Sequence, residues 1–489
     1  MRRVNRKSNI VNANGGGYNS CVNRVSRVAN PPARPLLLYD GDCRFCTLWI
    51  HRWQLATGDF LNFLPFQDPR GAAHFPEISR AQFDAAIQLV MPDGSVFSAA
   101  EAVCRSLACN PEEQWLRELY QHSPALAEFL ETAYRFVARH RKFFSAVTWL
   151  LWGGHLEPPR QNLVRWIFLR GLGVVYLAAF VSLWLQITGL AGSHGTSPAA
   201  RTLAAAKENF NAQGIGLNRY HLFPTLCWFS TSDGFLNVQC AAGTVLAGLL
   251  LCGIAPAPCL FLLWLIYLSL ATVCAGPPGF QWGNLLLETG LLAIFFAPFQ
   301  LRPRSPAGET PPSRIALWLL RWLLFRLTFE SACGQLLLNQ GAWPQNILGA
   351  VTLGIKLILP WAIFLPRRPR QLACVLLVAL QFLSLPADDH PLFNLLTITL
   401  CLTLLDDATI QNFLPKGFCK HGWLINQAPQ SEPRWPLVVL WSLVLLIGCA
   451  CYAHVFEFIG IYMPGPEPVM AVAKWLEPLR SINSYRPVP

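Results

Sequence analysis

Two cysteines that could react with other thiols lie two residues apart near the start of the chain, in the run Y-D-G-D-C-R-F-C that ends at Cys46. The apolar residues 36–38 before them predict a strand, and the residues after Cys43 have helical spacing. A cysteine at the start of a helix lies near unsatisfied backbone N–H groups and the positive end of the helix dipole, and both favour the thiolate. Because the thiolate is the reactive form, we expect Cys43 to form mixed disulfides that Cys46, one turn later, resolves.

Other functions of this pair are half of a zinc site or two core cysteines. No second C-x-x-C motif and no Cys/His cluster in the sequence completes four zinc ligands, so redox chemistry is the favoured interpretation. Asp42 has two opposed effects: its carboxylate could accept N–H groups at the helix start, but its charge raises the pKa of a neighbouring thiol.

The elements that position these cysteines belong to a small α/β domain. Strands are predicted at 36–39, 60–66, 87–91 and 95–97, and Pro92-Asp93-Gly94 predicts the hairpin turn between the last two. Helices are predicted at 43–56, at 98–107 and between 112 and 147. A strand–helix–strand unit followed by a hairpin and a helix is the order of a thioredoxin-like domain, which we place at residues 35–150.

The rest of the chain is too apolar for an ordinary soluble protein, since 53% of the 489 residues are hydrophobic and 13% are charged. Apolar stretches close to the length that crosses ~30 Å of hydrocarbon recur after residue 160. The candidates are 165–188, 236–254, 258–275, 283–300, 314–338, 346–365, 371–386, 391–406 and 436–455. The seventh and eighth are short and could form a re-entrant pair. We therefore predict an all-α multi-pass membrane domain of eight or nine helices at 163–456.

The net charge of +11 comes mainly from residues 1–34, which carry seven arginines and lysines and no acid. This tail lacks the apolar segment of a secretory signal peptide. An organellar transit peptide and a disordered basic tail both remain open, with the tail favoured. Nucleic-acid binding explains the charge poorly, because the rest of the chain is nearly balanced in charge and its basic residues flank the membrane segments.

Those flanking charges predict an orientation. With a cytoplasmic N-terminus, the even-numbered connections are cytoplasmic and carry most of the basic residues, as the positive-inside rule requires. They contain Arg302, Arg304, Arg314, Arg367, Arg368, Arg370, Lys416, Lys420 and Arg434, whereas the odd connections contain Arg201, Lys207 and Arg219. The thiol domain is then cytosolic and normally reduced, and the tail at 457–489 lies in the lumen or periplasm.

Polar residues inside the predicted spans are costly in hydrocarbon and therefore informative. Gln281, Asn284 and Glu288 share one helical face, and Arg326 lies on the next span with Arg321 about one and a half turns before it. Two interpretations stay open: Glu288 pairs with Arg321 or Arg326 to lock two helices together, or Gln281, Glu288, Arg321 and Arg326 form a polar site for a substrate group.

A basic run near the end of the first domain contains Arg135, Arg139, Arg141 and Lys142. A solvated face beside anionic lipid explains it, and substrate binding is the alternative.

The first domain resembles the DCC family of thiol-disulfide oxidoreductase-like proteins. The resemblance is carried by D-G-D-C-x-x-C, by D-G-S-V-F-S-A-A-E-A at 93–102 and by Y-R-F-V-A-R-H-R-K-F-F at 134–144. It implies a redox role for Cys43 and Cys46, with Asp42 part of the same signature. No proline precedes the 87–91 strand, where thioredoxins have a cis-proline, so we expect different handling of thiol substrates.

The membrane domain resembles the lipase maturation factor family from about 163 to 485. Matching segments lie at 176–187, 224–229, 264–270, 280–298, 319–327 and 393–407. The resemblance implies a membrane protein of the endoplasmic reticulum in eukaryotes that assists folding and dimer assembly of secreted lipases. Bacterial members are similar in sequence, with their client open.

The chain departs from that family pattern at several places. Gly283 replaces an expected Asp, the segment 330–335 lacks the usual Gly-rich, Lys-containing sequence, and an aromatic loop expected after Trp343 is absent. Residues 478–485 resemble the start of a large C-terminal soluble domain, so we expect 457–489 to be a truncated start of it.

The sequence therefore predicts a multi-pass membrane folding factor, chaperone-like, with a cytosolic thiol-disulfide oxidoreductase-like domain. Its expected partners are membrane lipid, a protein client such as a secreted lipase, and a thiol redox partner, with no cofactor, metal or nucleic acid. The alternatives are a transferase-like membrane enzyme and a truncated family member with little activity. The expected location is the endoplasmic reticulum membrane or a bacterial inner membrane. The client, the redox partner and the direction of electron flow stay open.

Overall fold

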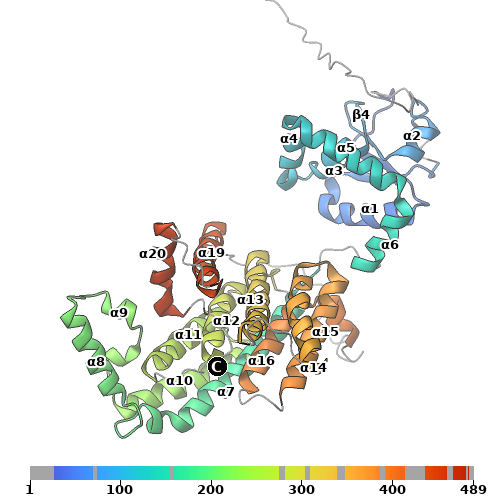
Figure 1. Ribbon diagram of the computed structural model, residues 1–489. Helices are drawn as coiled ribbons and strands as arrows, with labels where there is room; N and C mark the ends of the chain where they lie inside the picture. The colour runs from blue at the N-terminus through green and yellow to red at the C-terminus, as the bar shows by residue number, and fades with distance from the viewer. Residues whose placement is uncertain are drawn as a thin grey trace, which may run out of the picture. The chain divides into compact units, whose positions relative to one another are not determined.

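The structure is a computed structural model that describes residues 27–69, 74–153, 159–274, 281–302, 309–338, 347–385, 391–413, 435–459, 466–480 and 483 (Figure 1). The chain divides into two compact units, Met1–Pro158 and Pro159–Pro489. Several predictions lie wholly or partly outside the described residues: most of the basic tail, the loop after Trp343, and the flanking charges Arg304, Lys416, Lys420 and Arg434.

The N-terminal unit contains a four-stranded sheet in the order β2-β1-β3-β4. Its strands are β1 (Leu36–Tyr39), β2 (Asn62–Pro65), β3 (Gln88–Val90) and β4 (Val96–Ser98). β1 pairs in parallel with β2 and antiparallel with β3, which pairs antiparallel with β4. All four strands predicted from the sequence are present. β1 has the predicted bounds, and each of the other three differs from its prediction by one or two residues at its ends.

Helices surround this sheet (Figure 1). They are α1 (Arg44–Thr57), α2 (Arg80–Ala85), α3 (Ala99–Leu107), α4 (Trp115–His122), α5 (Pro124–Arg139) and α6 (Arg141–Trp152). α1 ends at Gly58, whose positive φ of 51° favours glycine. The β3–β4 turn needs Gly94 at φ 82°, and the Asp93 carboxylate accepts the Ser95 N–H.

Alternation along β1 builds a core on each face of the sheet. Leu38 packs with Phe66 and Phe83 on one face, and Leu37 packs with Ile50 of α1 on the other. Val28 is also buried in the first of these clusters, and its N–H donates to the Gly94 carbonyl at 2.9 Å. The folded unit therefore includes residues from the end of the segment predicted as a tail.

The second unit is helical. Its elements are α7 (Asn162–Leu190), α8 (Ala199–Ala212), α9 (Arg219–Leu222), α10 (Asp233–Cys252), α11 (Pro256–Val273), α12 (Gln281–Phe296), α13 (Arg314–Leu338), α14 (Ile347–Ile358), α15 (Arg367–Ser384), α16 (Pro391–Cys401), α17 (Asp407–Phe413), α19 (Leu437–Ile459) and α20 (Glu467–Leu476). Short 3-10 turns η4 (Leu226–Trp228), η6 (Leu359–Phe364), η7 (Leu402–Leu404) and η8 (Glu477–Leu479) connect or extend them.

Among the described residues, three helices are long and apolar enough to cross a membrane: α7, α10 and α11. A fourth span results if Pro391–Leu404 and Asp407–Phe413 count as one, with a bend of 114° between them. The other apolar helices lie where spans were predicted, but the count of eight or nine spans is not confirmed. The bend shows that the eighth candidate ends in a broken helix.

The α7–α10 crossing is the most extensive helix contact in this unit, and the two helices lie side by side in Figure 1. Gly243 of α10 faces the buried ring of Phe180 on α7, where an added Cβ would overlap the ring carbons. Glycine is therefore required here by close approach, as is common between membrane helices.

Gly243→Ala should lower the stability of the detergent-solubilised protein by ~1–3 kcal/mol, the usual cost of overpacking a filled site. Gly248→Ala, on the same helix with no atom within 4 Å of its added Cβ, is the matched control. It should be neutral or slightly stabilising because alanine favours helix more than glycine. Thermal unfolding of both variants in one detergent measures the difference, and equal midpoints would contradict this packing.

Candidate functional site

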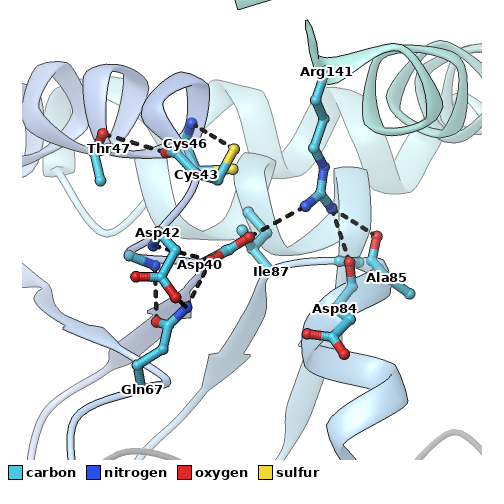
Figure 2. A network of polar contacts seen from close by, with 12 residues as sticks. Asp40, Asp42, Cys43, Cys46, Thr47, Gln67, Asp84, Ala85, Ile87 and Arg141 are labelled. Carbon is cyan, nitrogen blue, oxygen red and sulfur yellow. Dashed lines mark hydrogen bonds and ion pairs between the residues drawn. The ribbon is translucent and has the colours of Figure 1, made fainter.

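Cys43 and Cys46 lie where β1 passes into α1, as the sequence predicted. Cys43 occupies the N-cap of α1 in an extended conformation, and its sulfur accepts the Cys46 backbone N–H at 3.3 Å (Figure 2). Both cysteines are free thiols of intermediate exposure. A backbone N–H directed at the sulfur stabilises the thiolate, so the local fold itself activates Cys43.

The two thiols have opposite acidities. The pKa of Cys43 is lowered to about 6, chiefly because the Cys46 thiol donates a hydrogen bond to its sulfur, with further help from the Cys46 N–H and the positive charge of Arg141. The same hydrogen bond, followed by burial, raises the pKa of Cys46. The geometry is therefore that of a nucleophilic Cys43 and a protonated, resolving Cys46.

Asp42 does not cap α1. Its carboxylate is exposed and accepts from Nε2 of Gln67 at 3.2 Å, while its backbone N–H donates to Asp40 at 3.1 Å (Figure 2). Gln67 also donates to Asp40 at 2.7 Å and accepts the Gly41 N–H at 2.9 Å. Gln67, two residues beyond β2, thus holds the loop before Cys43, and the sequence interpretation did not identify it.

Arg141, the first residue of α6, is the second residue that sequence reasoning missed. It lies 3.6 Å from the Asp40 carboxylate and donates to the backbone carbonyls of Asp84 and Ala85 at 3.1 and 3.2 Å (Figure 2). The sequence grouped it with three neighbouring basic residues as a solvated face beside anionic lipid, with substrate binding as the alternative, and did not place it beside the thiols. Its half-buried position beside the thiols sets it apart from Lys142, which is exposed.

No proline directly precedes β3, the position at which thioredoxins have a cis-proline. The Ile87 N–H donates to the Tyr134 hydroxyl of α5 at 3.1 Å, so a side chain from the same unit occupies this backbone donor. Within the described ranges, no group of three or more His, Cys, Asp or Glu residues could hold a metal ion.

In the helical unit, Glu288 of α12 and Arg326 of α13 form a buried ion pair. Arg326 also lies 4.0 Å from Glu330. Arg321, the alternative partner for Glu288, instead donates two hydrogen bonds to the Thr403 carbonyl, at 3.0 and 2.8 Å. The structure therefore does not bring the four predicted intramembrane residues together in one site. Glu288 pairs with Arg326, and Arg321 binds a backbone carbonyl. The Gln281 side chain lies outside what the structure describes.

Two further ion pairs were not predicted, and in one of them the arginine is half-buried. Arg165 of α7 pairs with Glu309 at 2.7 Å, and Arg367 of α15 pairs with Asp406 at 2.7 Å. Asp407 accepts the backbone N–H groups of Asn162 and Val164 at the start of α7. In the sequence, the two adjacent acids Asp406 and Asp407 at the end of an apolar stretch could have indicated that buried partners hold them.

Gly283 of α12, which replaces the aspartate expected from the family pattern, lies against Tyr267. A Cβ added there would lie 3.0 Å from the Tyr267 hydroxyl, so the site has little room for the aspartate expected at this position.

Comparison with known proteins gives two family matches. A model of the lipase maturation factor transmembrane domain matches residues 163–345 and 334–412, and a model of DCC1-like thiol-disulfide oxidoreductase matches 37–146. Lipase maturation factor 2 of Gallus gallus is 34% identical over 335 residues, covering 61% of this chain and 44% of that protein. The Homo sapiens lipase maturation factor 2 is 32% identical over 339 residues, covering 60% and 45%.

Lipase maturation factor 1 of Mus musculus is 29% identical over 290 residues, covering 52% of this chain and 50% of that protein. The chain thus spans about half the length of the curated relatives it matches. No solved structure matches it.

Alkylation of Cys43 by iodoacetamide should follow the thiolate population, so in the reduced protein its rate should rise with pH around the pKa of about 6. Arg141→Gln removes a nearby positive charge and should move this midpoint to higher pH. Lys142→Gln, the neighbouring exposed position, should leave it unchanged. Timed alkylation with mass spectrometry of the Cys43 peptide measures all three midpoints. A wild-type midpoint at the ordinary thiol value would contradict an activated Cys43.

Glu288→Gln and Arg326→Gln should each destabilise the solubilised protein, by ~3–5 kcal/mol if the remaining charge stays buried. The double variant should recover part of that loss, because it leaves neither charge alone. The Glu288/Arg321 cycle is the control and should be additive within ~0.5 kcal/mol, since these two residues have different partners. Thermal or denaturant unfolding in detergent gives the values. Additivity in both cycles would rule out a structural pair.

Proposed function

The chain belongs to the lipase maturation factor family, and from that premise we propose that it is a membrane folding factor for secreted lipases with an attached thiol-disulfide oxidoreductase domain. It is an integral membrane protein. The observation that carries the proposal is the match of the transmembrane-domain model to residues 163–412, which covers the helices held by the buried ion pairs.

In this proposal the membrane unit crosses the bilayer eight or nine times and acts without enzymatic chemistry. The Glu288–Arg326 pair supports a structural role, because two buried opposite charges fix the relative position of α12 and α13. The protein resides in the endoplasmic reticulum membrane of a eukaryote or the inner membrane of a bacterium. The basic residues flanking the apolar stretches support a cytosolic N-terminal unit.

The N-terminal unit is proposed to be a thioredoxin-like protein dithiol. Cys43 attacks the disulfide of a protein partner, and Cys46 resolves the mixed disulfide that results. Asp42 contributes through the loop that Gln67 holds, and Arg141 keeps positive charge beside the reactive sulfur. The match of the DCC1-like model to 37–146 and the lowered pKa of Cys43 support this assignment.

Expression of the full chain in cells that lack their own lipase maturation factors should raise the activity of a co-expressed secreted lipase per unit of secreted lipase protein. The Gly248→Ala variant should do the same, because that site has open space. Wild-type protein that reaches the membrane at normal levels yet leaves lipase activity unchanged would overturn the proposed function.

A further inference from the structure

A largely apolar cavity of about 300 Å³ lies inside the N-terminal unit beside the cysteine pair. α1, α3 and α5 contribute most of its wall, including the aromatic side chains of Phe45, Trp49, Trp53 and Tyr134. Small-molecule sites in proteins usually measure ~300–1,000 Å³, so this cavity is the size for one substituted ring.

The polar groups of the cavity wall are mainly hydrogen-bond donors. The Trp49 indole N–H is buried and has no hydrogen-bond partner in the described part of the chain. The Tyr134 hydroxyl accepts from Ile87 and still carries a proton that it can donate. Arg141 adds a guanidinium, and Asp40 is already engaged by Gln67 and Arg141. A ligand that suits this wall is apolar and flat and carries acceptor oxygens.

The wall also contains a thiol. Cys46 lines the cavity, whereas Cys43 is not among the described residues that line it. The two sulfurs therefore have different neighbours: Cys43 lies at the start of α1, and Cys46 lies against the apolar space. A ligand in the cavity lies next to the resolving thiol of a redox pair, so a redox-active ligand there could exchange electrons with that pair.

We propose that the cavity binds the ring of a quinone, which takes two electrons from the Cys43/Cys46 dithiol. A quinone ring is flat and apolar, and its two carbonyl oxygens accept the hydrogen bonds that the wall offers. Quinones with apolar tails dissolve in the bilayer that the rest of this chain spans. The inference rests on the proposed dithiol function of the N-terminal unit and names a second electron acceptor beside the protein disulfide, a co-substrate that the sequence did not suggest.

The reaction balances without a further reagent. The S–S bond forms between Cys43 and Cys46, and the dithiol loses two electrons and two protons. The quinone gains both electrons. One of its oxygens takes the proton that Cys46 retains, and the other takes a proton from solvent, replacing the one that Cys43 released on ionising. The products are the Cys43–Cys46 disulfide and a hydroquinone, and a thiol reductant returns the disulfide to the dithiol.

The test uses the full chain in detergent, reduced, freed of reductant and kept without oxygen. The probe is duroquinone, whose ring is fully substituted and therefore cannot form a stable thioether with a cysteine. Hydroquinone is measured by absorbance and the Cys43–Cys46 disulfide by mass spectrometry. We expect one hydroquinone for each disulfide formed, and no hydroquinone from the Cys43→Ser/Cys46→Ser variant.

Three variants locate the reaction in the cavity. Ala133→Phe fills it from α5 and should slow quinone reduction about tenfold or more, whereas Ala125→Phe, on the exposed face of the same helix, should not. Trp49→Phe keeps the ring and removes the N–H, and should raise the half-saturating quinone concentration about three- to tenfold. For every variant, the reaction of Cys43 with an aryl disulfide reports whether the dithiol is intact.

The possible outcomes separate the two proposals. A dithiol that reacts with the aryl disulfide but not with duroquinone overturns the quinone site and leaves the proposed oxidoreductase function standing. Equal quinone rates in Ala133→Phe, Ala125→Phe and wild type also overturn it, because the reaction then occurs outside the cavity. A dithiol that reacts with neither reagent removes the proposed function itself.

Discussion

The helical unit depends on one constraint: every charge and every freed backbone carbonyl that is buried among its helices must find its partner inside the protein. Arg326 meets Glu288, Arg165 meets Glu309 and Arg367 meets Asp406. Each pair joins segments far apart in the sequence. In the first two pairs both partners are buried, so removing one partner leaves the other charge buried and unpaired, and these contacts set the relative position of the segments that they join.

The broken helix after α16 follows from the same constraint. The chain bends by 114° between the segment ending at Leu404 and α17, which frees carbonyls that an unbroken helix would use. Arg321 donates to the Thr403 carbonyl and Arg370 donates to the Leu404 carbonyl. Two buried arginines thus serve as caps, and their positive charges suit the negative end of the α16 dipole. An arginine within a span therefore need not indicate a substrate site.

Local signals in the sequence were sufficient for the thiol unit's strands and for the position of Cys43, because alternation, turn residues and the strand-to-helix change all act over a few residues. They were insufficient for Gln67 and Arg141, whose roles arise from contacts with Asp40 across the unit. In the helical unit, the Glu288–Arg326 pair could be proposed from polarity alone. The sequence could not show that Arg321 binds elsewhere, because the Thr403 carbonyl becomes free to accept its hydrogen bonds only where the helix breaks.

The two thiols of the N-terminal unit also differ in which polar groups surround them. The Cys46 thiol and its backbone N–H stabilise the negative charge of Cys43, so the pKa of Cys43 falls. The same thiol hydrogen bond, followed by burial against the apolar wall, raises the pKa of Cys46. A thiol that keeps its proton until its partner has reacted can deliver that proton to whatever lies beside it. Arg141 connects both environments, since it lies beside Asp40 on the cavity wall and its charge favours the Cys43 thiolate. Arg141 also begins α6, so the start of this helix is fixed at the redox site by the contacts of Arg141 with Asp40, Asp84 and Ala85.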